Sequence, residues 1–212
     1  RYTGKVRPWR SATLAFAEVG IVAGFSVDKG DLVRGPAADE PGTVLATLDK
    51  VKFQATVRAI RAELEKARWE EEKIERLFRQ GSASEEELKE VSLLCAVKET
   101  ELARAEKVLQ DATLRAPFTG TIAERFIEPG EAASPLIPAY RLIETDRVKV
   151  VVSIPGRRIL EVQVDQEADV EVEVDGRTGE TIILPGKVHS VPPAAAGQLF
   201  EVEIAVDNER GI

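Results

Sequence analysis

The fold is decided by residues 50–112, which read KVKFQATVRAIRAELEKARWEEEKIERLFRQGSASEEELKEVSLLCAVKETELARAEKVLQDA. Apolar or small residues recur here in a 4-3 alternation, and a seam with an average period of 3.5 residues is typical of a coiled coil. We therefore predict two antiparallel helices, which form a rod about 40–45 Å long at 1.5 Å per residue. The predicted seam positions are Phe53, Val57, Ile60, Leu64, Ala67, Ile74 and Phe78, then Leu88, Val91, Cys95, Leu102, Ala105, Leu109 and Ala112.

The two predicted helices are joined by a short segment that carries signals for both helix ends. Gly81 suits the left-handed conformation that often ends a helix. Ser84, with Glu87 three residues later, forms a capping box that opens the next helix. Glu71 and Lys98 are the two charged seam positions. For Lys98 two interpretations stay open: its side chain extends along the apolar surface to solvent, or it sets the register of the two helices.

A repeat with an offset of 100 residues flanks the helices. Residues 20–23 read GIVA and residues 120–123 read GTIA, while residues 27–31 read VDKGD and residues 127–131 read IEPGE. Neither half has enough apolar positions for a core of its own. We therefore predict that the two halves pack face to face as one small β-sandwich, with the helices as an insertion.

Residues 148–212 change character and read as short, evenly spaced strands. Two of the strands, at 168–174 and 200–206, alternate apolar and acidic residues, as half-buried strands do. We expect turns at Asp175–Gly176, Pro185–Gly186 and Pro192–Pro193, and one helical turn over residues 157–161. The predicted fold class is mixed α and β: a β-sandwich interrupted by a long antiparallel coiled-coil hairpin and followed by a small antiparallel β-barrel.

The composition argues against a nucleic-acid-binding protein, a membrane-spanning segment and a disulfide-rich fold. The net charge of −8 argues against nucleic acid as a partner. No segment approaches 18 consecutive apolar residues, so no membrane span is predicted. The chain begins at Arg1 and contains no methionine, and we interpret it as a fragment in which targeting signals are uninformative. One cysteine excludes an internal disulfide framework, and Cys95 is expected to be a buried thiol on the seam.

Motifs for catalysis, metals and nucleotides are missing from the sequence. The single histidine, His189, has no G-x-S-x-G nucleophile elbow to serve, and one histidine with one cysteine does not make a zinc site. No G-x-G-x-x-G or Walker loop occurs. The glutamates of the helices read as solvated charges, paired as Glu72–Arg76, Glu75–Arg79 and Glu85–Lys89. We predict a protein that is not an enzyme and has no catalytic, cofactor or metal site.

Two signatures resemble those of a known family. Residues 116–122, APFTGTI, resemble the second lipoyl half-motif of periplasmic adaptor subunits, the HlyD-like membrane fusion proteins of tripartite efflux pumps, and residues 20–33 resemble the first. Lys73, Leu77 and Ser84 match the spacing of the family's Arg-x3-Leu-x6-Ser signature, where the outer-membrane channel is bound. Lys73 replaces the arginine, which exchanges a bidentate donor for a point charge. Residues 148–212 resemble the family's β-barrel domain.

The resemblance implies a domain plan and a function. It places a lipoyl-like first half at 12–49, the α-helical hairpin at 50–112, a lipoyl-like second half at 113–146, and a β-barrel domain at 1–11 and 147–212. It implies a periplasmic adaptor attached to the inner membrane, which joins an inner-membrane efflux transporter of the resistance-nodulation-division type to an outer-membrane channel for export of drugs or other small molecules. It also implies a homo-oligomer, a hexamer, and membrane contact only through an anchor or partners outside residues 1–212.

Several alternatives stay open at this point. The chain is also compatible with an adaptor of an ABC-type exporter, or with a lipoyl-like carrier or scaffold subunit. A lipoyl domain carries its modified lysine on the turn that the hairpin replaces here, and Lys29 lies at a different turn, so no lipoyl cofactor is expected. At the tip, Leu77 is expected to lie beside the seam next to Phe78 and to contact the channel. Ser84 can be a helix cap or a contact, and Lys73 solvated or a contact.

Overall fold

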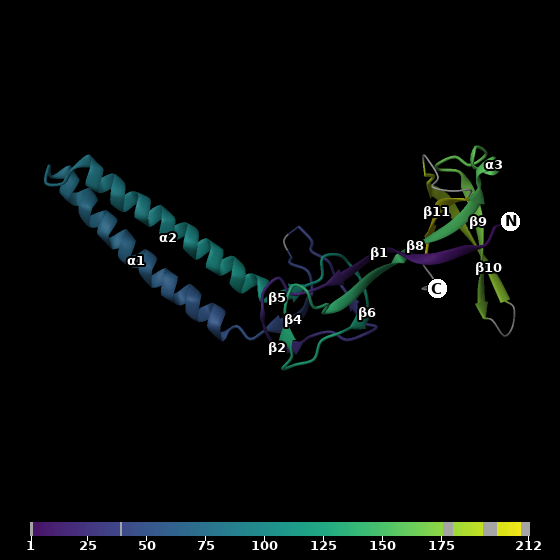
Figure 1. Ribbon diagram of the computed structural model, residues 1–212, viewed down its shortest axis with the longest axis horizontal. Coiled ribbons are helices and arrows are strands. Elements are labelled where there is room, and N and C mark those ends of the chain that lie inside the picture. Colours follow the sequence, from purple (N-terminus) through teal and green to yellow (C-terminus); the bar gives the residue numbers. More distant parts are fainter. Residues whose placement is uncertain (1, 39, 176–179, 193–198, 209–212) are drawn as a thin grey trace.

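The computed structural model describes residues 2–38, 40–175, 180–192 and 199–208, which form an elongated molecule with the two long helices at one end and, elsewhere, β structure with one short helix (Figure 1). Both N- and C-terminal segments lie toward the end opposite the helices. The elements follow in the order β1 (Gly4–Leu14), β2 (Gly20–Phe25), β3 (Leu32–Val33), β4 (Val44–Leu48), α1 (Val51–Arg79), α2 (Glu85–Asp111), β5 (Thr113–Arg115), β6 (Gly120–Arg125), β7 (Ala132–Ala133), β8 (Tyr140–Pro155), α3 (Gly156–Ile159), β9 (Glu167–Asp175), β10 (Glu180–Ser190) and β11 (Leu199–Asp207).

The two β repeats pair with each other, as the sequence predicted. β7 of the second repeat pairs with β2 of the first, and β3 of the first pairs with β6 of the second. The backbone N–H of Val22 donates to the carbonyl of Glu131 at 2.9 Å, and 100 residues on, that of Ile122 donates to the carbonyl of Asp31 at 3.0 Å. This exchange explains why neither half needs a core of its own.

The middle of the molecule has one apolar core between two sheets. One sheet has the strand order β5-β4-β2-β7, and the other contributes β3, β6, β8 and β1. Tyr140 is fully buried here, and its hydroxyl donates to the carbonyl of Leu45 at 3.2 Å. Burial raises the pKa of Tyr140 to about 12. The prediction of a mixed α and β fold with antiparallel sheets is confirmed. Other members of this core are Phe16, Val22, Leu48, Ile122 and Leu142.

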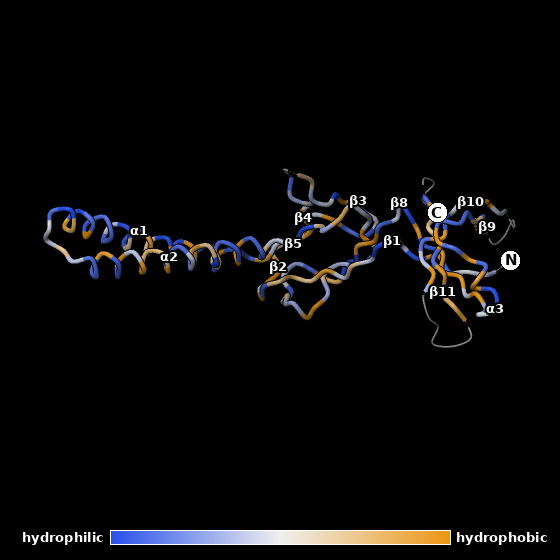
Figure 2. Tube along the Cα trace, turned by 90° about the horizontal axis from the view of Figure 1, so that it is seen from above, coloured by the Kyte–Doolittle hydropathy of each residue, from blue (hydrophilic) through white to orange (hydrophobic). Residues whose placement is uncertain are grey.

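The helices α1 and α2 run side by side as a hairpin (Figure 1). Hydrophobic and hydrophilic stretches alternate along both helices (Figure 2). The hairpin leaves and re-enters the β core at one place, because Leu48 N–H donates to the carbonyl of Ala112 at 2.9 Å and Thr47 pairs with Thr113. The predicted seam residues that expose less than a tenth of their surface are Phe53, Val57, Leu64, Ala67, Cys95 and Ala112, and of these Phe53 and Ala112 belong to the core of the middle region.

The prediction for Phe78 is wrong. Its side chain is 40% exposed, whereas the neighbouring Leu77 is half-buried. Phe78 stands at the far end of the hairpin, where α2 has only begun and gives little cover. The turn instead folds back on Leu77, whose carbonyl accepts hydrogen bonds from the N–H groups of Gln80 at 3.1 Å and Ser82 at 2.8 Å.

A second apolar core lies in the outer sheet, where β9, β10, β11 and β8 follow one another and β1 pairs with β8. β8 is 16 residues long and contributes residues to both cores, and β1 pairs with it along both of its ends. The second core is built mainly from Val148, Val150, Val152, Ile154, Val170, Val188, Val202 and Val206.

One predicted turn in this region is wrong. β10 runs straight through Pro185 and Gly186, which pair with Asp169 and Ala168 of β9. The pairing of β10 with β11 begins only at Gly186, so the missing N–H of Pro185 leaves no gap in that ladder. An added Cβ on Gly186 would lie 2.8 Å from a methyl group of Ile204, so this glycine permits close strand approach and not a turn. The predicted turns at Asp175–Gly176 and Pro192–Pro193 extend outside the described residues. The predicted helical turn is α3.

Candidate functional site at the hairpin tip

Ser84 occupies the N-cap of α2. Its Oγ accepts the backbone N–H of Glu87 at 3.1 Å, and its own N–H donates to the Glu87 carboxylate at 2.7 Å. This confirms the predicted capping box. The bonds from the backbone and side chain of Ser84 hold the pKa of Glu87 below its ordinary value. Ser84 is exposed, so the capping geometry leaves its outer side open to a partner.

Leu77 and Phe78 form the apolar part of the tip. Leu77 lies in the last full turn of α1 before Arg79 ends the helix, and Gly81 follows with φ of +72°. The positive φ reverses the chain and brings the start of α2 beside the end of α1. The tip therefore presents one half-buried aliphatic side chain and one aromatic side chain that is 40% exposed.

Lys73 lies one turn before Leu77 and already has partners within its own helix. Its Nζ is 2.9 Å from a carboxylate oxygen of Glu70 and 5.4 Å from the centroid of the Trp69 ring. The lysine is half-buried by these contacts. A partner that binds Lys73 must share or replace its bond to Glu70, so its charge is less available than that of a solvated lysine.

The structure places Lys73, Leu77 and Ser84 at the same end of the hairpin. Phe78 is the residue that the sequence reasoning assigned to the core and missed as a candidate contact. Its position within three residues of the helix-ending Gly81 was the available signal, because a seam residue at the end of a rod has a partner on one side only.

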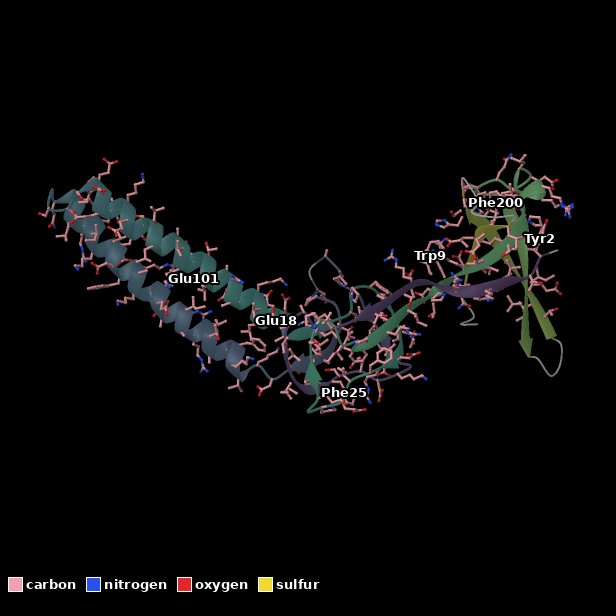
Figure 3. All side chains as sticks on the ribbon, viewed as in Figure 1. Tyr2, Trp9, Glu18, Phe25, Glu101 and Phe200 are labelled. Atoms are coloured by element: carbon pink, nitrogen blue, oxygen red, sulfur yellow. The ribbon has the colours of Figure 1, made fainter. Side chains whose placement is uncertain are left out.

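Other titratable groups have structural partners. The ring of His189 lies 4.8 Å from that of Trp9, which Figure 3 shows on the ribbon between the two β regions. Burial raises the pKa of the Cys95 thiol. Among the described residues, no group of three or more His, Cys, Asp or Glu side chains is placed to hold a metal ion. Within the same residues, none of the helices combines the length and the apolarity needed to cross a membrane.

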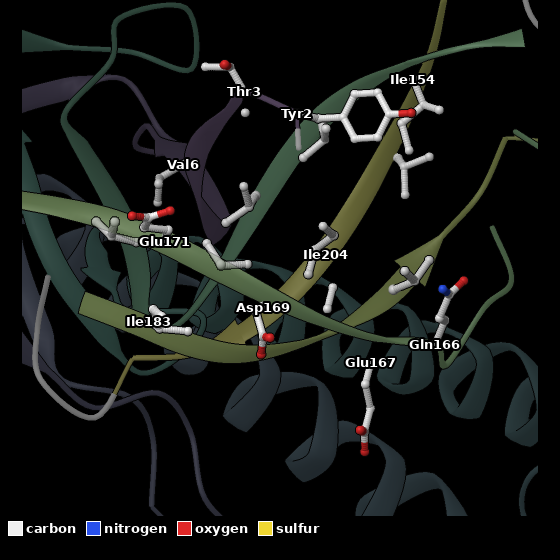
Figure 4. Close-up of a pocket in the computed structure, with 18 of the residues that line it drawn as sticks. Tyr2, Thr3, Val6, Ile154, Gln166, Glu167, Asp169, Glu171, Ile183 and Ile204 are labelled. Atoms are coloured by element: carbon white, nitrogen blue, oxygen red, sulfur yellow. The ribbon is translucent and has the colours of Figure 1, made fainter. Parts of the chain in front are cut away.

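A groove of about 1010 Å³ lies between β1 and β9 (Figure 4). Its lining is mostly aliphatic, with Val6 and Ile183 more than half exposed. The acidic Glu167 and Asp169 follow one another along β9 at its rim. The groove is therefore a mainly apolar surface with acidic side chains at one rim.

Comparison with known proteins finds a relative by sequence. No family model matches the chain. The nodulation protein NolF of Rhizobium meliloti (strain 1021) is 28% identical over 228 residues, which cover 100% of this chain and 59% of NolF. The chain therefore spans about three fifths of the length of this relative.

Solved structures share the fold across the whole chain. A chimera of MacA with the α-hairpin domain of Pseudomonas aeruginosa MexA has a TM-score of 0.85 at 16% identity, with 100% of this chain and 75% of the chimera covered. The membrane fusion protein Spr0693 of Streptococcus pneumoniae R6 has a TM-score of 0.78 at 17% identity, with 98% and 92% covered. MacA from Actinobacillus actinomycetemcomitans has a TM-score of 0.62 at 16% identity, with 100% and 73% covered. The chain therefore has the fold of the membrane fusion proteins, which confirms the resemblance indicated by its sequence signatures.

Proposed function

We propose that this chain belongs to a periplasmic adaptor that links an inner-membrane efflux transporter to an outer-membrane channel for export of drugs or other small molecules. The observation that carries the proposal is a membrane-fusion-protein fold that ends in a rod with a small, partly apolar tip. The role is mechanical and not enzymatic. The similarity to NolF and to MacA with a MexA hairpin supports this reading.

The proposed parts follow the domain plan of the sequence. Residues 12–49 and 113–146 would form one lipoyl-like sandwich, residues 50–112 a coiled-coil hairpin, and residues 1–11 with 147–212 the wall of a β-barrel. The two separate apolar cores support the division into sandwich and barrel. The buried seam between α1 and α2 supports the coiled coil.

In the proposed assembly, six copies stand as a ring in the periplasm. The β base meets the transporter, of the resistance-nodulation-division type, and the adaptor is attached to the inner membrane. The hairpin tips meet the channel. Length supports this role, since a 29-residue α1 extends about 43 Å from the β core at 1.5 Å per residue.

The proposed channel contact uses Lys73, Leu77 and Ser84, with Phe78 added by the structure. An apolar side chain at the end of a helical rod suits a groove between helices of another protein. Leu77 and Phe78 supply that apolar surface, and the exposed Ser84 supplies a polar one. Lys73 would contribute a charge that is shared with Glu70.

The test is deletion of the gene, followed by restoration with the intact gene, with accumulation of fluorescent efflux substrates in the cells as the readout. We expect accumulation to rise on deletion and to return to normal on restoration. Chemical crosslinking in the same cells should capture an inner-membrane transporter and an outer-membrane channel. Capture of an ATP-hydrolysing transporter would favour the ABC-type alternative. A lipoyl group found on Lys29 by mass spectrometry would overturn the adaptor proposal in favour of a carrier subunit.

A further inference from the structure

The two β regions of the molecule meet at an irregular junction between β1 and β8. We call the region around Tyr140 the inner β region and the region around the second core, which contains Val202, the outer β region. The register of β1 on β8 shifts between Pro8 and Arg10, so that Trp9 alone faces residues 145–147 of β8. Such a bulge interrupts the ladder of backbone hydrogen bonds and bends the strand. The junction is therefore the point at which the angle between the two regions can change.

Trp9 fills this junction with an indole ring that is contacted by three side chains. Figure 3 shows Trp9 on the ribbon between the two β regions. The centroid of the indole lies 4.6 Å from Cζ of Arg147 and 5.2 Å from Nζ of Lys149. The His189 ring lies 4.8 Å away and is tilted by 58°. All three distances are within the range of attractive contacts between a cation and an aromatic face or between two tilted rings.

The three partners of the indole belong to the outer β region. Arg147 Nε lies 3.0 Å from a carboxylate oxygen of Asp207, and Lys149 Nζ lies 3.2 Å from one of Glu203, both on β11. His189 is a residue of β10. The indole therefore ties β1 to β8 and β10 directly, and to β11 through two ion pairs.

The backbone of the bulge is held as well. Asn208, which is 6% exposed, donates its backbone N–H to the carbonyl of Asp146 at 2.8 Å and its side-chain amide to the carbonyl of Thr145 at 2.9 Å. These bonds satisfy two carbonyl groups of the bulge, and buried backbone groups need such partners. The junction thus has a defined backbone arrangement, and Trp9 is the side chain that joins the strands around it.

We propose that Trp9 clasps the junction and fixes the angle between the inner and outer β regions. Trp9 is a positioning residue, and the proposal goes beyond the proposed function and does not depend on it. The clasp needs an aromatic face and not only a large side chain, because two of its contacts are cations over the ring. The 29-residue α1 extends about 43 Å beyond the inner β region at 1.5 Å per residue, so a small change of angle at the junction becomes a large displacement of the hairpin tip.

Distance measurements by pulsed electron spin resonance on the purified full-length protein test the clasp. Cys95 is first changed to Ala, and nitroxides are attached at Leu136→Cys and Leu160→Cys. Leu136 is 93% exposed in the inner β region and Leu160 is 89% exposed in the outer one, so the labels disturb neither core. We expect a narrow distance distribution in the protein that keeps Trp9 and a wider one in Trp9→Ala. Equal widths would overturn the proposal.

Trp69→Ala is the matched control, because it removes the same side chain from the hairpin, where the ring is 59% exposed. We expect it to leave the distribution unchanged, and equal widening by Trp69→Ala would overturn the proposal. Two further variants separate the aromatic ring from its volume. Trp9→Phe keeps an aromatic face and should widen the distribution less than Trp9→Leu. Equal widths in these two variants would contradict an aromatic clasp.

The partners of Trp9 provide a second test, which also holds if Trp9→Ala does not fold. Asp207→Asn with Glu203→Gln removes the ion pairs but leaves both cations at the indole. Adding Arg147→Gln and Lys149→Gln removes the cations too. We expect the distribution to widen clearly only in the second protein, with circular dichroism showing that both are folded. Equal distributions in the two proteins would overturn the clasp.

Discussion

Arg125 forms an ion pair with Asp28, with 3.1 Å between Nε and Oδ1, and so joins the second β repeat to the first. The same guanidinium lies 3.0 Å from the carboxylate of Glu128, which is the residue equivalent to Asp28 one repeat later. It also lies 4.1 Å from the centroid of the Phe25 ring. One cation thus holds the equivalent turns of both repeats.

This cluster predicts a pH dependence of stability. The N–H of Lys29 and the side chain of Arg125 hold the pKa of Asp28 below its ordinary value. A carboxyl whose pKa is lowered by folding stabilises the native state above about pH 4, and the stabilisation is lost as the pH falls through the lowered pKa. Urea unfolding measured from pH 7 to pH 2 should therefore show that the free energy of unfolding falls less in Arg125→Gln than in the wild type as the pH is lowered. Parallel profiles of unfolding free energy against pH for the two proteins would contradict the prediction. Arg141→Gln, which removes an exposed ion pair with Glu124, is the control.

The two turn glycines should respond alike to substitution. Gly30 has φ of +93° and Gly130 has φ of +88°, and an added Cβ at either position meets nothing within 4 Å. The cost of alanine is therefore backbone strain alone, about 1–2 kcal/mol at each site. Thermal or urea unfolding of Gly30→Ala and Gly130→Ala measures it. Gly24→Ala is the control, since its Cβ also meets nothing and no positive φ is involved. Unequal losses at the two turns would argue against their equivalence.

The hairpin should be dispensable for folding of the β core. Its ends meet at the Leu48–Ala112 hydrogen bond, so a short turn can replace residues 51–111. Phe53 would be lost from the core, and it is 8% exposed in the intact chain, so we expect a folded but less stable product. Dispersed amide resonances and cooperative unfolding would show this. A product without cooperative unfolding would mean that the sandwich needs the helices.

Much of this fold follows from local sequence rules. The capping box at Ser84, the left-handed Gly81 and the 100-residue repeat all depend on neighbours in sequence or on self-similarity, and each appears in the structure as predicted. The pairing of Lys98 with Glu63 across the hairpin did not follow, because it depends on the register of two helices. The predictions of a buried Phe78 and of a turn at Pro185 were wrong for the same reason. Side-chain burial and strand pairing depend on residues that are distant in sequence.

Leu77→Glu should abolish export while the protein is still made and folded. A buried leucine contributes about 1.5–3 kcal/mol, and Leu77 is only half-buried, so the stability loss should be about 1 kcal/mol. Substrate accumulation, protein level and circular dichroism measure the three effects. Val51→Glu is the control, because it places the same charge on an exposed aliphatic position at the other end of α1. Normal export by a well-expressed Leu77→Glu protein would argue against docking by the tip.

Two substitutions at Ser84 separate capping from contact. Ser84→Ala removes the cap and should cost about 1 kcal/mol, seen as faster hydrogen exchange in the first turn of α2. Ser84→Asn keeps a capping oxygen and a donor toward the Glu87 carboxylate, and should keep that protection. If export fails in Ser84→Asn while exchange stays slow, the serine itself meets the partner. Unchanged exchange in Ser84→Ala would contradict the capping role.

β8 imposes a constraint on how the chain can change in length. Its residues Tyr140 and Leu142 point into one core, and Val148, Val150, Val152 and Ile154 point into the other. Side chains alternate along a strand, so adding or removing one residue between 143 and 147 would turn one of these two sets outward. Both cores thus depend on the same alternation of side chains along β8. A one-residue insertion between 143 and 147 can be tolerated only if a β-bulge takes up the extra residue.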